Sequence, residues 1–431
     1  MFKNRIGILA EKKPGESRIA LPPRFIKTIN NNADYHLTVE PSDTRSFTND
    51  EFIEHNIIID SIPEDANVIL AVKEIPIQRI EADKTYMYFS HTIKGQDYNM
   101  NMLQHVLDVK ATLIDYEVIR DAQGRRLVFF GRYAGIAGMI NSLWTYGKKL
   151  QIDGINNPFL KIKQARDYRD FDEAIVSLKS LKAEIHSFAN KQNAPLIIGI
   201  AGYGNVSKGA QEVLDLLDPQ VITPAKLLTN KKPGLYKVVF KEQDSVQTIE
   251  EAASFELQDY YENPEKYKPA FSQYLPYISV LVNCIYWTAK YPRLIYKKDI
   301  DKLFKQKNIG LKTIGDISCD IVGGIEITTK ATISNDPIYT YNPETGQAED
   351  GLTQNGIAMM TVDNLPAELP REASMGFGEK LLPLMESLFT CDFSNDFNSL
   401  VLTPELKCAV IAHKGKLTPE FSYLTSYLEN K

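Results

Sequence analysis

The chain has 431 residues, of which 43% are hydrophobic and 24% charged, a composition that predicts a globular protein of two or three domains and excludes a short peptide or a disordered chain. Its 49 basic and 55 acidic residues give a net charge of −6. No net positive field is available to attract polyphosphate, so we expect no nucleic acid partner.

The four cysteines form no CxxC pair and no zinc-ligand pattern with histidine, which indicates a reducing compartment and no bound metal. The longest strongly apolar stretch, residues 195–202, is far shorter than the roughly 20 residues that span a bilayer. No signal-like apolar core follows the first basic residues. We therefore expect a cytoplasmic protein without a membrane segment.

Short runs rich in β-branched and aromatic residues alternate with helical spacing in the first third of the chain. The predicted strands are residues 5–9, 35–39, 66–72, 86–89 and 111–115, and the predicted helices include residues 22–30 and 100–109. Near-continuous apolar strands suit a parallel sheet that is covered on both faces. The pattern predicts an α/β domain with crossover helices.

Residues 131–150 have the spacing of an amphipathic helix, which we interpret as the connection between two domains. Its small residues would allow another helix to pack closely: Ala134, Gly135, Ala137 and Gly138. Residues 161–191 are polar and charged and predict one or two surface helices.

A second α/β domain is predicted from the strands at residues 195–202, 280–285 and 312–317. Residues 244–274 read as an insertion with surface helices, and residues 356–389 have helical spacing, interrupted by Pro366 and Pro370, that would return the chain to the first domain. The predicted fold is α/β, with two Rossmann-like domains whose parallel-sheet cores are separated by an active-site cleft. The substrate domain would comprise residues 1–134 and about 360–431, and the dinucleotide-binding domain residues 135–359.

A glycine turn follows the buried strand 195–202 and precedes a helix, in the order Gly202-Tyr-Gly-Asn-Val-Ser-Lys-Gly209. Glycines permit a tight turn and the close approach of a pyrophosphate, whose charge the helix N-terminus stabilises. Ser207 stands where the usual fingerprint has a third glycine. A purely structural turn is the alternative interpretation.

The choice between the two nicotinamide dinucleotides depends on the next strand, predicted at residues 220–224. It ends without the acidic residue that would bond a ribose 2′-hydroxyl. Thr223 and Lys226 are candidates for binding a 2′-phosphate, although Lys226 could be an ordinary surface lysine. We therefore prefer NADP(H) slightly over NAD(H).

Lys73 and His91 each follow the end of a predicted strand, where ligand sites lie in open α/β sheets. Two titratable groups at such ends suit acid/base chemistry. The alternative is that Lys73 pairs with a surface carboxylate and His91 caps a turn. Cys284 also ends a strand, but its apolar neighbours favour a packing role over that of a nucleophile.

The motif Glu11-Lys-Lys-Pro-Gly-Glu-Ser-Arg-Ile-Ala-Leu-Pro22 resembles the N-terminal signature of the alanine dehydrogenase and transhydrogenase superfamily. Six further motifs look like the lysine-ketoglutarate reductase (lysine-forming saccharopine dehydrogenase) domain of bifunctional aminoadipic semialdehyde synthases: residues 89–96, 113–117, 131–141, 204–211, 283–287 and 363–370. The resemblance implies reversible condensation of L-lysine with 2-oxoglutarate and reduction of the imine to saccharopine by NAD(P)H. Since the chain ends at Lys431, we expect a free-standing reductase without the second dehydrogenase of the bifunctional proteins.

The resemblance also implies roles for individual residues. Lys73 and His91 match the family's catalytic pair, and Arg18 matches an arginine that holds a substrate carboxylate. Glu74 and Glu117 match acidic residues that lie near the pair and tune its charge. Beyond what the resemblance implies, the further candidate substrate contacts are Lys94, Gln96, Arg125 and Arg126. Asp316 and Asp320 fall where the family lines the cleft near the nicotinamide and the substrate. With the glycine turn, the candidate cofactor contacts are Gly202, Tyr203, Gly204, Asn205, Val206, Ser207, Thr223, Cys284, Ile285, Tyr286, Asp316, Ile317, Asp320 and Leu365.

Saccharopine carries three carboxylates, so the substrate site should be locally basic in an acidic protein. Arginine grips a carboxylate through two parallel hydrogen bonds, which favours Arg18 over the lysines. Arg125 and Arg126 follow a predicted turn at residues 121–124, and a solvated hairpin end is the alternative for them.

Two other functions compete with a reductase of lysine and 2-oxoglutarate. One is an alanine-dehydrogenase-like enzyme that acts on a small amino acid. The other is a nucleotide-binding sensor or scaffold that has lost catalysis, against which the presence of both Lys73 and His91 weighs. A homo-oligomer is possible in each case.

Overall fold

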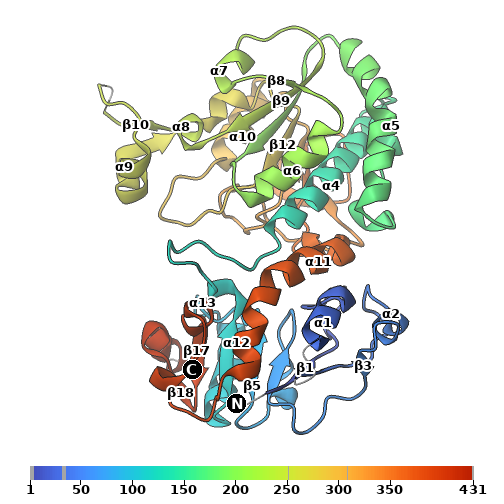
Figure 1. The fold of residues 1–431 in the computed structure, drawn as a ribbon. Coiled ribbons are helices and arrows are strands. Elements are labelled where there is room, and N and C mark those ends of the chain that lie inside the picture. The colour runs from blue at the N-terminus through green and yellow to red at the C-terminus, as the bar shows by residue number, and fades with distance from the viewer. Residues whose placement is uncertain (1–3, 32–34, 251, 308, 430–431) are drawn as a thin grey trace. The chain divides into compact units, whose positions relative to one another are not determined.

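The computed structural model describes residues 4–31, 35–250, 252–307 and 309–429, and the chain divides into two compact units (Figure 1). Unit 1 comprises Met1–Phe130 and Pro370–Lys431, and unit 2 comprises Gly131–Leu369. The described part of each unit is built on an eight-stranded sheet. The sequence predicts domain limits at residues 134/135 and about 360, and these limits stay a prediction.

The sheet of unit 1 has the strand order β18-β17-β6-β5-β4-β1-β2-β3. Its strands are β1 (Arg5–Ile8), β2 (His36–Val39), β3 (Ile58–Ile59), β4 (Val68–Leu70), β5 (Thr85–Tyr88), β6 (Thr112–Asp115), β17 (Val410–His413) and β18 (Lys416–Leu417). The five strands predicted in the first third of the chain are confirmed, and they pair in parallel. The predicted parallel core is confirmed, and β17 and β18 add an antiparallel edge to it, so the sheet as a whole is mixed.

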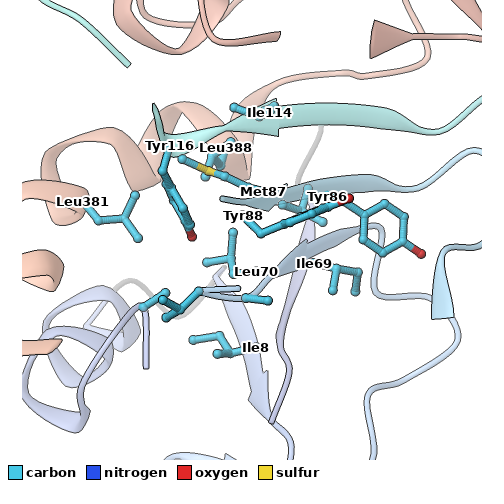
Figure 2. Packing of buried hydrophobic residues seen from close by; sticks show 14 of the residues in the cluster. Ile8, Ile69, Leu70, Tyr86, Met87, Tyr88, Ile114, Tyr116, Leu381 and Leu388 are labelled. Carbon is cyan, nitrogen blue, oxygen red and sulfur yellow. The ribbon is translucent and has the colours of Figure 1, made fainter. Parts of the chain in front are cut away.

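Helices from both ends of the chain cover this sheet. They are α1 (Pro23–Asn30), α2 (Asn49–Ile53), α3 (Asp97–Asp108), α11 (Pro370–Leu381), α12 (Met385–Thr390), α13 (Pro404–Lys407) and α14 (Thr425–Glu429). Figure 2 shows Leu70 and Tyr88 of the strands in one buried cluster with Leu381 and Leu388 of α11 and α12. The C-terminal segment therefore completes the core of the N-terminal strands.

The sheet of unit 2 has the strand order β15-β14-β16-β13-β12-β7-β9-β8. Its strands are β7 (Leu196–Ala201), β8 (Gln220–Val221), β9 (Leu235–Phe240), β12 (Val280–Asn283), β13 (Thr313–Asp316), β14 (Ile338–Asn342), β15 (Gln347–Asp350) and β16 (Ile357–Met360). The three predicted strands are confirmed as β7, β12 and β13. Both β14 pairings are antiparallel, so this sheet is also mixed. The helical reading of residues 356–389 is wrong at its start, because β16 is a buried strand.

The predicted helix at residues 131–150 is α4 (Gly131–Ile152), but its amphipathic character is wrong, because the helix is buried without a break from Gly135 to Leu143. Its close packing is confirmed. A Cβ atom on Gly135 would lie 1.9 Å from the Val206 carbonyl oxygen, and one on Gly209 would lie 2.0 Å from that of Arg132. The backbones of α4 and α6 (Asn205–Asp215) therefore meet without side chains between them.

The other helices of unit 2 lie around the sheet: α5 (Phe171–Asn190), α7 (Pro224–Leu227), α8 (Glu242–Ser245), α9 (Leu257–Glu262) and α10 (Lys297–Lys305). α5 confirms a surface helix within residues 161–191. The predicted insertion holds α9, but also a two-stranded antiparallel sheet of β10 (Val246–Thr248) and β11 (Tyr267–Pro269) that was not predicted. Figure 1 shows β10 and α9 projecting from the main sheet. None of the described helices combines the length and apolarity that a bilayer-spanning helix needs.

Candidate active site and nucleotide site

In unit 1, the ends of β4 and β5 bring Lys73, Glu74 and His91 to one edge of the sheet. The two strands are adjacent and parallel, so the segments that follow them leave the sheet on the same side. Nδ1 of His91 lies 2.5 Å from Oε1 of Glu74. His91 adopts a φ of +49°, a left-handed conformation that is rare for a residue other than glycine. The imidazole is thus held by a side chain from the neighbouring strand end.

The carboxylate of Glu74 is ionised in this pair. Burial alone would raise its pKa, but the hydrogen bond from His91 and the nearby positive charges outweigh burial and lower the pKa from 4.5 to about 2. A carboxylate can only accept, so the Nδ1–H group of His91 donates. Nε2 is left as the ring nitrogen that can exchange a proton with a substrate.

Asp115, a residue that the sequence analysis did not single out, fixes the turn that carries His91. It ends β6 and is fully buried. Its Oδ2 accepts the backbone N–H of Ser90 at 3.0 Å and also the Ser90 hydroxyl, while its Oδ1 accepts the backbone N–H of Glu117 at 2.7 Å. Burial raises the pKa of Asp115 to about 6. The sequence places Asp115 at the end of a predicted strand, but nothing in the sequence indicates its contact with Ser90.

Lys73 is held by its backbone rather than by its ammonium group. Its N–H donates to Oε2 of Glu11 at 3.0 Å, and that of Val72 donates to Oε1 at 2.6 Å. Within the described residues the Lys73 side chain makes no ion pair, so the surface-pair alternative finds no support. Burial, and then the positive charges of Arg18 and Lys13, lower the pKa of Lys73, a direction that the sequence left open. A lowered pKa increases the share of neutral amine, which is the form that accepts a proton.

Arg18 lies buried in the same unit with its guanidinium against Glu16. Its Nε donates to Oε1 of Glu16 at 2.7 Å and its Nη2 to Oε2 at 2.5 Å, in a two-point contact. The guanidinium also lies 4.1 Å from the ring centre of Phe130. This geometry fixes the position of Arg18, and its contact with a substrate carboxylate stays a prediction.

The remaining predicted substrate residues differ in burial and in the contacts that they make. Gln96 has a buried side-chain oxygen that finds no hydrogen-bond partner among the described residues. Glu117 is half-buried beside Asp115, and Lys94 is exposed. Arg125 is exposed and pairs with Asp121 at 2.7 Å in the hairpin turn, which matches the solvated alternative. The Arg126 guanidinium instead lies 5.3 Å from the ring centre of Phe89, two residues before His91.

In unit 2, the glycine turn joins the buried strand β7 to α6 as the sequence predicts. Gly202 has a φ of +95°, which glycine alone adopts readily. A Cβ atom on Gly204 would meet no atom within 4 Å, so the turn is open on that side. The turn leaves room for a pyrophosphate at the N-terminus of α6, and the residues present fit a dinucleotide. Ser207 is buried on α6, where Gly209 provides the close helix contact instead.

β8 (Gln220–Val221) confirms a strand at the start of the predicted run 220–224, but the strand that pairs with β7 is β9. β8 is only two residues long and lies beyond β9 at the edge of the sheet. Thr223 caps α7, where its hydroxyl accepts the backbone N–H of Lys226 at 3.2 Å. The residues that follow β9 are Lys241 and Glu242, which the sequence analysis did not consider.

A cavity of about 490 Å³ lies at the carboxyl ends of these strands, a volume within the range of small-molecule sites. The glycine turn and the strand ends contribute Gly202, Tyr203, Phe240, Lys241, Glu242, Asn283, Ile285 and Tyr286. Three predicted cofactor residues besides Gly202 therefore line it: Tyr203, Ile285 and Tyr286.

The other predicted cofactor residues after β12 and β13, and on the segment before α11, do not line this cavity. Most of them lie in the interior of unit 2. Asp316 is buried and accepts hydrogen bonds from Asn283 at 2.8 Å and from Thr328 at 2.6 Å, and burial raises its pKa. Ile317 and Leu365 lie against Gly138 of α4. Burial raises the pKa of Cys284, as its packing interpretation expects. Asp320 is exposed on the loop after β13, and no cluster of metal-ligating side chains occurs among the described residues.

Comparison with known proteins places the chain beside pyridine-nucleotide enzymes. Residues 7–137 match the alanine dehydrogenase/PNT N-terminal domain, and residues 237–420 match the alanine dehydrogenase/PNT C-terminal domain. The chain is 33% identical to mouse mitochondrial alpha-aminoadipic semialdehyde synthase over 96% of its own length and 47% of that protein. It is 34% identical to the Arabidopsis thaliana protein of the same name, with coverage of 97% and 41%. The chain thus spans about half the length or less of these relatives.

A saccharopine dehydrogenase [NAD(+), L-lysine-forming] of Emericella nidulans is matched nearly end to end, with 27% identity over 90% of this chain and 93% of that protein. Among solved structures, an L-alanine dehydrogenase aligns with a TM-score of 0.61 and 14% identity, covering 98% of this chain and 99% of the other. A transhydrogenase from Sinorhizobium meliloti aligns with a TM-score of 0.53 and 12% identity, covering 97% and 100%. These structures share the α/β fold.

Proposed function

We propose that the chain, which belongs to the alanine dehydrogenase/PNT family, is a lysine-forming saccharopine dehydrogenase. The chain carries both the N-terminal and the C-terminal domain of this family. It would catalyse the reversible reductive condensation of L-lysine with 2-oxoglutarate to saccharopine. The relatives that match almost the whole chain bear the names of this enzyme and of aminoadipic semialdehyde synthase. The observation that carries the proposal is the Glu74–His91 pair beside Lys73.

The chemistry requires proton transfers that these residues can perform. The substrate amine must be neutral to attack the ketone, and the carbinolamine must then lose water. Lys73, with its lowered pKa, can take up the proton of the substrate ammonium group. His91, oriented by Glu74, can give a proton from Nε2 to the departing hydroxyl. The nicotinamide cofactor, when bound, supplies the hydride that reduces the imine.

The nucleotide is a pyridine dinucleotide, and we favour NADP(H) over NAD(H). Three cations line the cavity of unit 2. Lys290 donates to the Tyr261 carbonyl at 2.5 Å, and Arg293 donates to the carbonyls of Val322 and Gly323. The ammonium of Lys241 lies instead over the ring of Tyr203, 5.7 Å from its centre. Lys241 directly follows β9, so it replaces Thr223 and Lys226 as the candidate for binding a 2′-phosphate.

A screen of substrate pairs with each cofactor tests the function. Oxidation of NADPH or NADH should require lysine and 2-oxoglutarate together. Turnover with ammonia and pyruvate alone would favour an alanine-dehydrogenase-like enzyme, and cofactor binding without turnover would favour a sensor. Lys73→Met and His91→Gln should each lower kcat by at least about 100-fold while cofactor affinity is kept. Near-normal rates in both variants would remove the catalytic assignment.

A cytoplasmic location is also part of the proposal. All four cysteines are free thiols in the structure. Free thiols persist in a reducing compartment. Fractionation of cells that express the tagged full-length protein would test the location.

A further inference from the structure

One wall of the cavity in unit 2 is supplied partly by the predicted insertion and partly by the loop after a strand of the main sheet. On this side, the segment around α9 and the loop after β12 contribute Tyr260, Tyr261, Trp287 and Tyr291, here called the aromatic wall. The glycine turn contributes Tyr203 to the lining of the same cavity. The predicted insertion therefore borders the space beside the turn that would hold a pyrophosphate.

The aromatic wall is fixed by its own contacts. The ring of Tyr260 lies 5.3 Å from that of Tyr291 and 5.2 Å from that of Tyr267 on β11. Nε1 of Trp287 donates to the carbonyls of Tyr291 and Pro292, each at 3.1 Å. Such a surface is formed before a ligand arrives, which lowers the entropic cost of binding.

Glu242 connects the aromatic wall to the glycine turn. Its Oε1 accepts a hydrogen bond from the Tyr261 hydroxyl at 2.9 Å and a longer one from the Tyr203 hydroxyl at 3.3 Å. Burial, together with Glu242, raises the pKa of the Tyr261 phenol, so the phenol stays protonated and donates. One carboxylate oxygen thus joins the end of β9, the helix α9 and the turn.

We propose that the insertion forms part of the adenosine site, with Glu242 as the positioning residue that fixes the hydroxyls of Tyr261 and Tyr203 in the cavity lining. A flat, uncharged purine ring suits an aromatic wall, because every base has a face that stacks on such side chains. An acidic residue after this strand would ordinarily bond the ribose. Here Glu242 instead acts through the two tyrosines, so its contribution should be the same for NADH and NADPH.

This inference rests on the proposed function only for the identity of the ligand, a nicotinamide dinucleotide. The test measures Kd by titration calorimetry for the wild type, Tyr261→Phe, Glu242→Gln and the double variant. The ligands are NADH, NADPH and nicotinamide mononucleotide. Tyr277→Phe, an exposed tyrosine outside the cavity lining, is the control.

We expect Tyr261→Phe and Glu242→Gln each to raise the Kd for NADH and for NADPH by about 10-fold, which is the effect of one lost hydrogen bond. The double variant should be no weaker than Glu242→Gln alone, because both substitutions remove the same contact. Affinity for nicotinamide mononucleotide should not change. The inference would be overturned if Glu242→Gln weakened the binding of NADH alone while Tyr261→Phe left the binding of both dinucleotides unchanged. That result would show that Glu242 bonds the ribose.

Trp287 provides a second readout, since the chain has only two tryptophans. In a Trp144→Phe background, ADP-ribose should quench the remaining fluorescence, and an unchanged signal at saturation would overturn the placement of the base. A wild type that binds no dinucleotide would overturn both proposals. A wild type that binds dinucleotides but does not turn over lysine and 2-oxoglutarate would contradict the proposed function alone.

Discussion

Glu74 and His91 form a 2.5 Å hydrogen bond between Oε1 and Nδ1, and the two residues come from the ends of adjacent strands. Because the pKa of Glu74 is lowered to about 2, its carboxylate remains charged at any pH at which the enzyme would work. The pair therefore selects the histidine tautomer or ion that carries a proton on Nδ1. It leaves Nε2 as the reactive atom.

Glu74→Gln should lower kcat by about 10- to 100-fold, because the neutral amide orients the imidazole less firmly and does not stabilise the imidazolium. The affinity for the dinucleotide, whose proposed site lies in unit 2, should stay within twofold of the wild type. Steady-state kinetics with lysine, 2-oxoglutarate and NADPH provide the measurement. Glu54→Gln, at an exposed position of the same unit, is the matched control. A Glu74→Gln enzyme with full kcat would contradict the role.

Lys13→Gln should shift the acid side of the kcat/KM profile to higher pH by about half a unit. The positive charge of Lys13 helps to lower the pKa of Lys73, so its removal lets that pKa rise. More alkaline conditions are then needed to obtain the neutral amine. Lys12→Gln, also exposed and one residue away, should leave the profile in place. A shift toward lower pH for Lys13→Gln would contradict the assignment of Lys73 as a base.

The strand-and-turn plan of both units could be predicted because it is local. Each predicted strand in the first third is a short apolar run bounded by polar residues, and the glycine turn is contiguous. β9 was missed because Lys237 interrupts its apolar run. In the structure this lysine is buried and neutralised by Asp215 at 2.5 Å, a partner on another element.

The residues that position Lys73 and His91 could not be predicted, because they are distant from these residues in the sequence. Glu11 reaches Lys73 across 62 positions of sequence, and Asp115 reaches Ser90 across 25. Nothing in the spacing of these residues indicates such contacts, which depend on the order of strands in the sheet. The amphipathic reading of α4 failed because the helix is covered on several sides, by α6 and by the strands β12, β13 and β16.

The stability of the protein should fall as pH rises through the range in which Glu11 loses its proton. Burial raises the pKa of Glu11 from 4.5 to about 7, despite the hydrogen bonds from Val72 and Lys73 that favour its charged form. Between these values the folded chain holds a proton that the unfolded chain has released, so the free energy of unfolding decreases with pH. Below about 4.5 this contribution is fully present, and above about 7 it is lost.

Glu11→Gln should remove that dependence. We expect the wild-type Tm to fall by a few degrees more than that of the variant between pH 5 and pH 7.5. The amide keeps one acceptor oxygen, so at pH 5 the variant should lose only the equivalent of one hydrogen bond, about 1 kcal/mol. Differential scanning fluorimetry across pH gives the comparison. Parallel Tm curves for the two proteins would refute the assignment to Glu11.

Lys241→Met should weaken NADPH binding by about 10- to 100-fold and leave NADH within twofold, because the 2′-phosphate would lose a charge-assisted hydrogen bond while the apolar stem is kept. Lys231→Met, at an exposed position of the same unit, is the control. Titrations of both dinucleotides at fixed ionic strength are needed, since surface charge alone responds to salt. Equal losses for NADPH and NADH would show that Lys241 does not read the phosphate.

Gly135→Ala should destabilise unit 2 although alanine is the better helix former by about 1 kcal/mol. The new Cβ atom would lie 1.9 Å from the Val206 carbonyl oxygen and 2.8 Å from the Ala210 nitrogen, and both are backbone atoms of α6 that cannot rotate away. The two helices must separate, at a net cost of about 3 kcal/mol. Because α6 carries the N-terminal N–H groups at the glycine turn, dinucleotide affinity should fall together with Tm.

Gly204→Ala separates the two effects. Its φ is −75° and no atom lies within 4 Å of the added Cβ, so Tm should stay within about one degree of the wild type. The methyl group would occupy the space that a pyrophosphate approaches, and dinucleotide affinity should drop by at least about 10-fold. In thermal melts, Tm should therefore fall for Gly135→Ala and stay unchanged for Gly204→Ala. In titrations, dinucleotide affinity should fall for both variants. If Gly135→Ala kept the wild-type Tm, the close packing of α4 on α6 would not be the constraint that places the turn.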